Sequence, residues 1–317
     1  MHINDILNTA QKTLFSFEIL PPLKGGTFDE IYQSIKPLLE FEPPYINVTY
    51  HQEEVIYKNH ESGLLEKKTV RKRPGTVGIA AALQYYCKVN VVPHIICGGF
   101  SKEETENALI DLHFLGVHNV LAVRGDAERS QKEFIPEPDG HSHAVDLVKQ
   151  IIALNEGNYL DEDLQNSTAT NFSVGVAGYP EKHSEAPNML SDIRYLKQKV
   201  DAGASYIVTQ LFFDNQKYFD FVKLCRDNDI HVPIIAGIKP ISLKNHLQVL
   251  PKIFHTEIPD ELVREVEKCK DNKAVRQVGV EWGIRQCREL IEVGVPAVHF
   301  YTMGKSDNIY QIARACF

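Results

Sequence analysis

The run FSFEILPP at residues 15–22 is a short β-rich stretch that carries one carboxylate, Glu18, and ends in two prolines that stop a strand. Stretches with helical periodicity separate it from further runs of the same kind. Those runs lie at 45–50, 89–97, 119–124, 172–179, 206–213, 233–238 and 297–303. Eight near-continuous apolar strands alternating with helices predict a parallel sheet closed into a single-domain (β/α)8 barrel over residues 1–317, in preference to a doubly wound sheet.

Several connecting segments carry helix boundary signals. Ser101 with Glu104 three residues later predicts a capping box, and the apolar face that follows stops at Gly116. The same signals predict a helix from about 191 to 202. Two more helices are expected near 259–270 and 272–293, between the seventh and eighth strands.

Two stretches fit the alternation poorly. Residues 51–75 are polar and basic and follow the second strand, and residues 126–143 are rich in Pro, Gly and charge and follow the fourth. A barrel places such loops on the face that holds active sites, so we expect both to cover the site. Residues 155–171 belong to the opposite face and predict an exposed connection.

Composition excludes several classes of protein. A formal charge of -8 and a pI near 5.9 argue against nucleic acid as a partner, because phosphate binding needs a basic surface. The short basic stretch from Lys67 to Arg73 is interpreted as a solvated loop, with contact to an anionic ligand tail as the alternative. The six cysteines form no CxxC pair, and no leader or membrane-length apolar run is present, which favours a cytoplasmic protein with reduced thiols and no membrane partner.

Glu18 has two interpretations. A carboxylate among Phe and Ile at the end of a strand suggests a group that transfers protons, because ionised carboxylates are rarely buried alone. A structural salt bridge would also place a carboxylate there. The residues alone leave both open.

Polar side chains at the carboxyl ends of the strands should share one cavity with Glu18. No preformed metal site and no Ser or Cys nucleophile motif is evident among them, although a barrel could assemble a metal site from His94, His183 and an acid. The tripeptide Arg124-Gly125-Asp126 would let a flat ligand approach the backbone between two opposite charges. The segment YPEKH at 179–183 adds an aromatic ring and an imidazole, typical of a nucleotide-like cofactor site. The expected cavity residues are Glu18, Thr49, Tyr50, His94, Arg124, Asp126, Tyr179, His183, Gln210, Asp214, Lys239 and Tyr301.

These segments, in this order, resemble the methylenetetrahydrofolate reductase family over essentially the whole chain. The resemblance is carried by SFEILPP (16–22), NVTY (47–50), PHIIC (93–97), LAVRGD (121–126), HAVDLV (143–148), YPEKHSEA (179–186), KVDAGA (199–204), TQLFFD (209–214), GIKPI (237–241) and HFYTM (299–303). A barrel lyase and a non-catalytic folate- or flavin-binding protein remain the alternatives. A lyase that uses Glu18 as a base leaves Arg124-Gly125-Asp126 and the 179–199 segment unexplained. Glu18, Asp126 and Gln210 argue against a binding protein, because binding alone needs no buried general acid.

The resemblance implies a barrel that binds FAD and reduces 5,10-methylenetetrahydrofolate to 5-methyltetrahydrofolate by ping-pong hydride transfer from NADH or NADPH, which supplies methyl groups for methionine synthesis. It gives Glu18 the role of general acid, and an apolar strand would keep that carboxyl protonated near neutrality. It places Asp126 beside the flavin, where a negative charge favours hydride donation, and assigns Gln210 and Asp126 to the pterin ring.

The resemblance also implies the FAD-binding residues, and these are Thr49, Tyr50, His94, Arg124, Gly125, Asp126, Ala144, Tyr179, His183, Ala186, Asp192 and Lys199. Tyr195 and Gln198 stand where bacterial relatives often have Asn and Arg, so we expect the adenosine end of FAD to be held differently here. Lys305 follows the last strand where the family often has arginine. Bacterial relatives imply NADH as the donor and a homo-oligomer.

Overall fold

The computed structural model describes residues 1–59, 63–127, 131 and 133–317. Its centre is a closed barrel of parallel strands in the order β1-β10-β9-β8-β7-β6-β5-β2. The barrel strands are β1 (Leu14–Ile19), β2 (Tyr45–Val48), β5 (Asn90–Ile96), β6 (Asn119–Val123), β7 (Ser173–Gly178), β8 (Tyr206–Thr209), β9 (Ile234–Ile238) and β10 (Ala297–Tyr301). Seven lie within the predicted runs and β1 begins one residue before its run, which confirms the (β/α)8 prediction.

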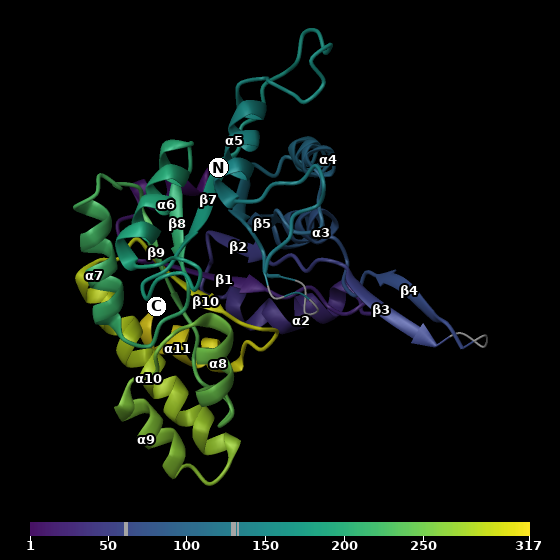
Figure 1. Ribbon diagram of the computed structural model, residues 1–317. Coiled ribbons are helices and arrows are strands. Elements are labelled where there is room, and N and C mark those ends of the chain that lie inside the picture. Colours follow the sequence, from purple (N-terminus) through teal and green to yellow (C-terminus); the bar gives the residue numbers. More distant parts are fainter. Residues whose placement is uncertain (60–62, 128–130, 132) are drawn as a thin grey trace.

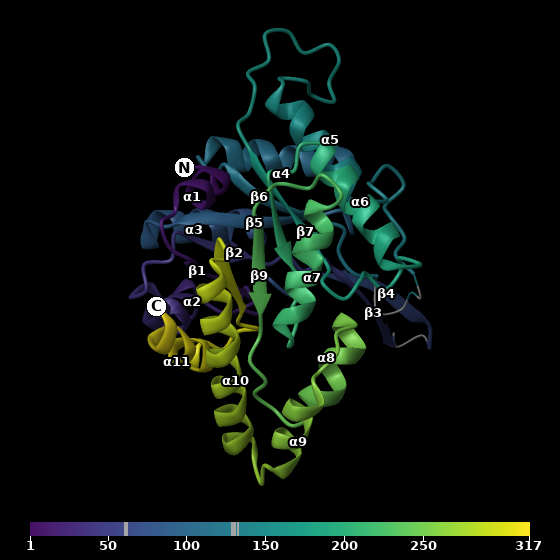
Figure 2. The ribbon, with the colours of Figure 1, turned by 90° about the vertical axis from the view of Figure 1, so that its left-hand side faces the viewer.

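Helices surround the barrel, as Figures 1 and 2 show. Those that follow its strands are α2 (Phe28–Leu39), α3 (Thr76–Cys87), α4 (Lys102–Phe114), α5 (Ala144–Asn155), α6 (Met189–Asp201), α7 (Asn215–Arg226), α8 (His246–Phe254), α9 (Asp260–Lys268), α10 (Asn272–Val293) and α11 (Asp307–Cys316). The capping box of α4 forms as predicted, with Ser101 Oγ accepting from Glu104 N. Helix α6 begins two residues earlier than predicted, because Asn188 is its N-cap and accepts from Ser191 N.

The outward faces of the strands pack under these helices. Alternate residues such as Phe15, Phe17, Val298 and Phe300 belong to one large buried cluster with helix residues. Helix α1 (Ile3–Thr9) contributes instead to the floor of the barrel, where Ile3 joins the inward side chains of the lower strand ends. The polar residues of the next inward layers therefore lie toward the carboxyl ends of the strands.

Two elements extend from the end of the barrel where the strands finish. Strands β3 (Glu54–Asn59) and β4 (Leu65–Val70) pair antiparallel into a separate two-stranded sheet that projects away from the barrel (Figure 1). Helices α8 and α9 and part of α10 form the extension at the bottom of Figure 2, with their own buried cluster. The 155–171 connection lies at the opposite end, as predicted.

The polar stretch 51–75 lies between β2 and α3, where a βα connection was predicted, and it contains the β3–β4 hairpin. The interpretation of the basic residues 67–73 as a solvated loop was wrong for the first of them. Lys68 lies in β4 with an exposed side chain, so the basic stretch begins inside a strand. Strand-favouring residues such as Ile56 and Tyr57 in β3 and Val70 in β4 suit a short antiparallel pair of this kind. Among the described residues, the structure has no helix with the length and apolarity needed to cross a bilayer.

Candidate functional site

The inward side chains of the barrel are stacked in layers. The floor layer is apolar and contains Val92, Leu121 and Tyr206. In a strand the side chains of residues two apart lie on the same face. The residues two positions beyond the floor therefore form the next inward layer, and that layer is polar. Glu18 stands one step higher, two residues after Ser16 on β1 and next to Tyr301 of β10 in the strand register.

Glu18 is a buried carboxyl at the mouth of the barrel. The residue is 9% exposed, and its backbone carbonyl accepts a hydrogen bond of 2.8 Å from Thr302 Oγ1. Burial raises the pKa of Glu18 to about 8, and the positive charge of Lys239 opposes part of that rise. The carboxyl is therefore protonated at neutral pH, which is the state a general acid requires.

Two imidazoles lie in the polar layer below, that of the buried His299 and that of the half-buried His94. His94 Nε2 and Asn47 Nδ2 are 3.2 Å apart, and His299 Nδ1 and Ser16 Oγ are 2.9 Å apart. Burial lowers the pKa of both histidines to about 3, so both rings are neutral. His94, one of the predicted cofactor residues, thus presents a neutral ring beneath the mouth.

The Arg124-Gly125-Asp126 tripeptide follows β6 and lies on the rim. Gly125 has a φ of +86°, a conformation that favours glycine. The Arg124 guanidinium donates two hydrogen bonds of 2.6 Å to the Glu185 carboxylate and lies over the Phe134 ring, 4.9 Å from its centroid. Asp126 is exposed.

Glu185 is a site residue that the sequence did not reveal. Its two-point pair with Arg124 joins the loop after β6 to the loop after β7. The pair raises the pKa of Arg124 and lowers that of Glu185. A cofactor phosphate that uses Arg124 would have to share it with this carboxylate.

The loop after β7 brings together the other predicted charged and aromatic residues. The rings of Tyr179 and His183 lie edge to face with centroids 4.8 Å apart, and Asp192 Oδ2 accepts a 2.9 Å hydrogen bond from His183 N. Lys199 Nζ donates to the Ala177 carbonyl at 2.6 Å. Burial lowers the pKa of Lys199 to about 8, and the nearby Asp192 carboxylate opposes part of that fall.

The remaining predicted site residues also surround the mouth. Thr49 Oγ1 donates to the Ile19 carbonyl at 3.1 Å, and the Tyr50 ring packs 5.0 Å from the Phe100 ring. Gln210 follows β8, and its Oε1 accepts from Leu211 N at 2.9 Å, which leaves the amide nitrogen available for a ligand. Ala144 is the first residue of α5, and Ala186 is buried in the loop after β7.

Asp214 does not join the site, although it follows the same strand as Gln210. Its side chain caps α7 by accepting a 2.9 Å hydrogen bond from Gln216 N. Tyr195 and Gln198 have exposed side chains on α6. In the described part of the chain, no group of three or more His, Cys, Asp or Glu side chains is arranged to hold a metal ion.

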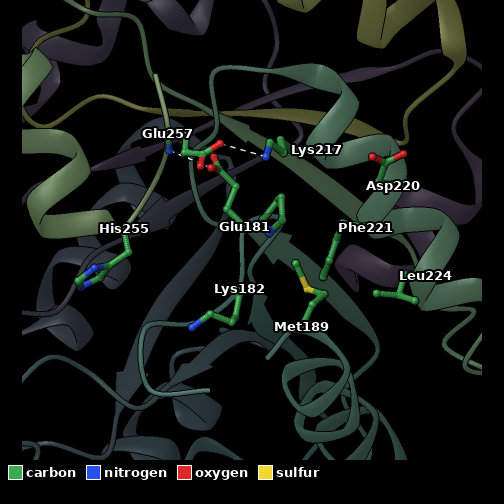
Figure 3. Close-up of a pocket in the computed structure, with 10 residues that line it drawn as sticks. Glu181, Lys182, Met189, Lys217, Asp220, Phe221, Leu224, His255 and Glu257 are labelled. Atoms are coloured by element: carbon green, nitrogen blue, oxygen red, sulfur yellow. Dashed lines mark hydrogen bonds and ion pairs between the residues drawn. The ribbon is translucent and has the colours of Figure 1, made fainter. Parts of the chain in front are cut away.

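A separate cavity of about 430 Å³ lies outside the mouth, between the loop after β7, helices α6 and α7, and the segment after α8. Figure 3 shows Glu181 at its edge. The Glu181 carboxylate accepts hydrogen bonds from Thr256 Oγ1 at 2.6 Å and from Glu257 N at 2.8 Å. Lys217 pairs with Glu257 at 3.0 Å. Glu181 therefore connects the loop after β7 to the segment after α8.

Comparison with known proteins connects this site to a family. The sequence model of a family described as "Methylenetetrahydrofolate reductase" matches residues 2–316. A Caenorhabditis elegans protein named "Probable methylenetetrahydrofolate reductase (NADPH)" is 31% identical over 96% of this chain and 42% of its own length. An Oryza sativa protein named "Probable methylenetetrahydrofolate reductase (NADH)" is 32% identical over 92% of this chain and 46% of its own length. This chain thus spans about half the length of these curated relatives.

A bacterial relative matches over nearly its full length. The "5,10-methylenetetrahydrofolate reductase" of Buchnera aphidicola is 28% identical over 98% of this chain and 93% of its own. Among solved structures, a Clostridium thermocellum protein described as binding two copies of 5-methyl-5,6,7,8-tetrahydrofolic acid superposes with a TM-score of 0.58, at 16% identity over 100% of this chain and 98% of its own. An oxaloacetate acetylhydrolase superposes with a TM-score of 0.52, at 9% identity over 94% of this chain and 78% of its own. Likenesses of this kind show the barrel fold alone.

Proposed function

This chain belongs to the methylenetetrahydrofolate reductase family, and from that membership we propose that it is an NAD(P)H-dependent oxidoreductase that reduces 5,10-methylenetetrahydrofolate to 5-methyltetrahydrofolate. The observation that carries the proposal is Glu18, a carboxyl whose burial raises its pKa to about 8 at the mouth of the barrel. The Clostridium thermocellum protein of the same fold is described as binding the product proposed here.

The residues on the rim fit FAD as the resident cofactor. They offer a guanidinium, an ammonium, an imidazole and a glycine that lacks a side chain beside its backbone, which suit the phosphates and flat ring of a flavin dinucleotide. FAD, when bound, relays hydride from the nicotinamide nucleotide to the folate, so the two substrates react in turn. The residues proposed to hold it are Thr49, Tyr50, His94, Arg124, Gly125, Asp126, Ala144, Tyr179, His183, Ala186, Asp192 and Lys199.

Glu18 has the central chemical role. Opening the five-membered ring of the folate breaks a carbon–nitrogen bond, and the leaving nitrogen takes the proton that Glu18 holds. The carbon of the bridge then accepts the hydride and becomes the methyl group. Asp126 and Gln210 hold the pterin ring, the former as an acceptor and the latter through its free amide nitrogen.

The proposal also covers the location, the assembly and the nucleotide donor of the protein. We place the protein in the cytoplasm, as one barrel domain over residues 1–317 that assembles into a homo-oligomer and supplies methyl groups for methionine synthesis. NADH is the proposed donor, and the names of the relatives include both nucleotides. Light scattering on the purified protein measures the oligomer, and steady-state rates with NADH and NADPH decide the donor.

The test of the proposal separates the two half-reactions. The purified protein should show a flavin spectrum that bleaches with NADH under anaerobic conditions and returns when methylenetetrahydrofolate is added. Glu18→Gln should keep the bleaching and lose the return, by about 10²-fold or more in rate, because an amide cannot donate the proton. Glu103→Gln on the exposed face of α4 is the matched control and should leave both steps unchanged. A colourless protein that cannot be reconstituted with FAD, or full folate reduction by Glu18→Gln, would overturn the proposal.

A further inference from the structure

Lys239 lies in the same inward layer as Glu18. On β9 the side chains of Ile234, Ala236 and Ile238 pack outward under the helices, so the alternation turns Lys239 into the barrel. Phe300 of β10 pairs with Ile238 in the strand register, and Tyr301 pairs with Glu18 of β1. The side chains of Lys239, Tyr301 and Glu18 thus lie at one level on three neighbouring strands.

The Lys239 ammonium is placed where a charge is costly. The residue is 6% exposed, and Nζ donates to the Tyr301 carbonyl at 3.5 Å, which is a long hydrogen bond. A weak bond of this kind replaces little of the lost hydration of an ammonium. A lysine in this position needs a second source of compensation, and the carboxyl at the same level supplies it when that carboxyl is ionised.

We infer that Lys239 is a positioning residue for Glu18, whose ammonium stabilises the negative charge that Glu18 acquires when it gives its proton to the substrate. The inference deepens the proposed function and rests on it for the identity of the proton acceptor. Lys239 itself neither contacts the folate ring nor donates the proton.

The surrounding charges agree with this arrangement. Lys239 lowers the pKa of Glu18 against the larger effect of burial, and burial lowers the pKa of Lys239 to about 8 while the Glu18 charge opposes part of that fall. The charge of Lys305 lowers the pKa of Lys239. Burial, together with the charges of Lys239 and Lys305, lowers the pKa of His246 to about 4. Burial and the Glu18 charge raise the pKa of the Tyr301 hydroxyl, so it stays neutral.

The proton step balances within this group. The O–H bond of Glu18 breaks as the N–H bond forms on the leaving nitrogen of the folate, and the electron pair stays on the carboxylate beside the Lys239 ammonium. Without that ammonium the carboxylate would be a stronger base in the same apolar surroundings. Glu18 would then hold its proton too tightly to be an efficient acid.

The test measures the proton affinity of Glu18 directly, in the holoenzyme as purified. The protonated carboxyl has an infrared C=O stretch that disappears when the group ionises, and the band absent from Glu18→Gln identifies it. Titration of this band in the unaltered protein, in Lys239→Met and in Lys239→Arg gives the pKa of Glu18 without substrate turnover. Lys305→Met removes a neighbouring cation that acts on Lys239 and is the matched control.

Lys239→Met should raise the pKa of Glu18 by about one unit or more, the size of the effect of an adjacent opposite charge. Lys239→Arg should stay close to the unaltered protein, and Lys305→Met should leave the Glu18 band in place. An unchanged midpoint in Lys239→Met would overturn the inference, as would an equal shift in Lys239→Arg. If Lys239→Met does not fold, Lys239→Gln removes the same charge and decides the question.

Kinetics supply the second readout. In Lys239→Met the alkaline limb of the folate half-reaction should move up in pH, with the rate at neutral pH reduced about tenfold, while the pH profile of flavin reduction by NADH stays unchanged. A loss of both half-reactions with an unmoved limb indicates a structural role and contradicts the inference. Failure of the proposed function would look different, since folate reduction would survive Glu18→Gln whatever the infrared titration gives.

Discussion

At the scale of single residues, the sequence predicted which side chains meet, and the structure shows which of them interact. Glu18 was recognisable because a carboxylate inside an apolar strand is uncommon. Its dependence on Lys239 was not, because the register that aligns β9, β10 and β1 is a property of the closed barrel. The Arg124–Glu185 pair was hidden for the same reason, since two loops meet in space over 61 positions of sequence.

The raised pKa of Glu18 makes stability depend on pH. Between about 4.5, its ordinary value, and about 8, the folded protein keeps a proton that the unfolded chain loses. Unfolding therefore releases a proton, and rising pH lowers the free energy of unfolding by up to about 1.4 kcal/mol per pH unit from this group. Urea unfolding of the unaltered protein and of Glu18→Gln from pH 5 to pH 8 should show the difference changing steadily in favour of the variant.

A difference that stays constant over this range would show that the carboxyl has an ordinary pKa in the folded protein. Above pH 8 the free energy of unfolding should instead increase with pH, because of Lys239. Lys239 has a pKa lowered to about 8 from 10.5, so between these values unfolding takes up a proton and rising pH increases stability.

Gly125 provides a backbone test at the rim. With φ at +86°, Gly125→Ala introduces strain and should lower the free energy of unfolding by about 1 kcal/mol and weaken FAD binding. Gly78→Ala is the matched control, because Gly78 lies in α3, has an ordinary φ, and an added Cβ there meets no heavy atom within 4 Å. That variant should gain about 0.5–1 kcal/mol. Urea unfolding and flavin titration measure both, and an unstrained Gly125→Ala contradicts the expected effect.

At the scale of elements, local signals located most helices and strands but not their tertiary uses. The capping box at Ser101 was predictable because both partners are three residues apart in sequence. The β3–β4 hairpin was not, because its polar, basic sequence has no regular alternation of polar and apolar residues to indicate a strand. Asp214 looked like a cavity residue because it follows β8, yet its position just before α7 made it a cap.

Substitution of Glu181 tests which contacts hold the loop after β7 against the segment after α8. Glu181→Ala removes the acceptor for Thr256 Oγ1 and Glu257 N, and should lower the free energy of unfolding by about 1–2 kcal/mol. Hydrogen exchange at 255–257 should become faster. Asp220→Ala, on α7 beside the same cavity and exposed, is the control and should leave exchange at 255–257 unchanged. Equal protection in both variants would mean that the loop is held by other contacts.

At the scale of the whole molecule, eight apolar runs with helices between them were sufficient to predict the barrel. Strand pairing in such a fold follows chain order, apart from closure of the first strand on the last. The sequence did not indicate that α1 would join the floor of the barrel, because a short helix with three apolar positions carries no signal of its destination.

Substitution of Ile3 tests how much the floor contributes to the free energy of unfolding. It is fully buried against the lower strand ends, and Ile3→Ala should lower the free energy of unfolding by about 2–4 kcal/mol through lost burial and a residual cavity. Asp5→Ala on the exposed side of the same helix should cost only a few tenths of a kcal/mol, roughly the value of a charge in a first turn. Both variants should keep the flavin half-reactions, since the floor lies at the far end of the barrel from Glu18. Urea unfolding decides, and equal losses would exclude a floor role for Ile3.

The pairing of β1 with β10 sets a limit on when the site can exist. Leu14 aligns with Ala297, so the barrel closes between strands that are made first and last during synthesis. Contacts over such a sequence distance form late in folding, because the loop entropy must be overcome before they are gained. Glu18 and Tyr301 come together only in that closing step. A chain still growing on the ribosome therefore holds its acid exposed to water, with an ordinary affinity for protons, and becomes a competent proton donor only when the last strand arrives.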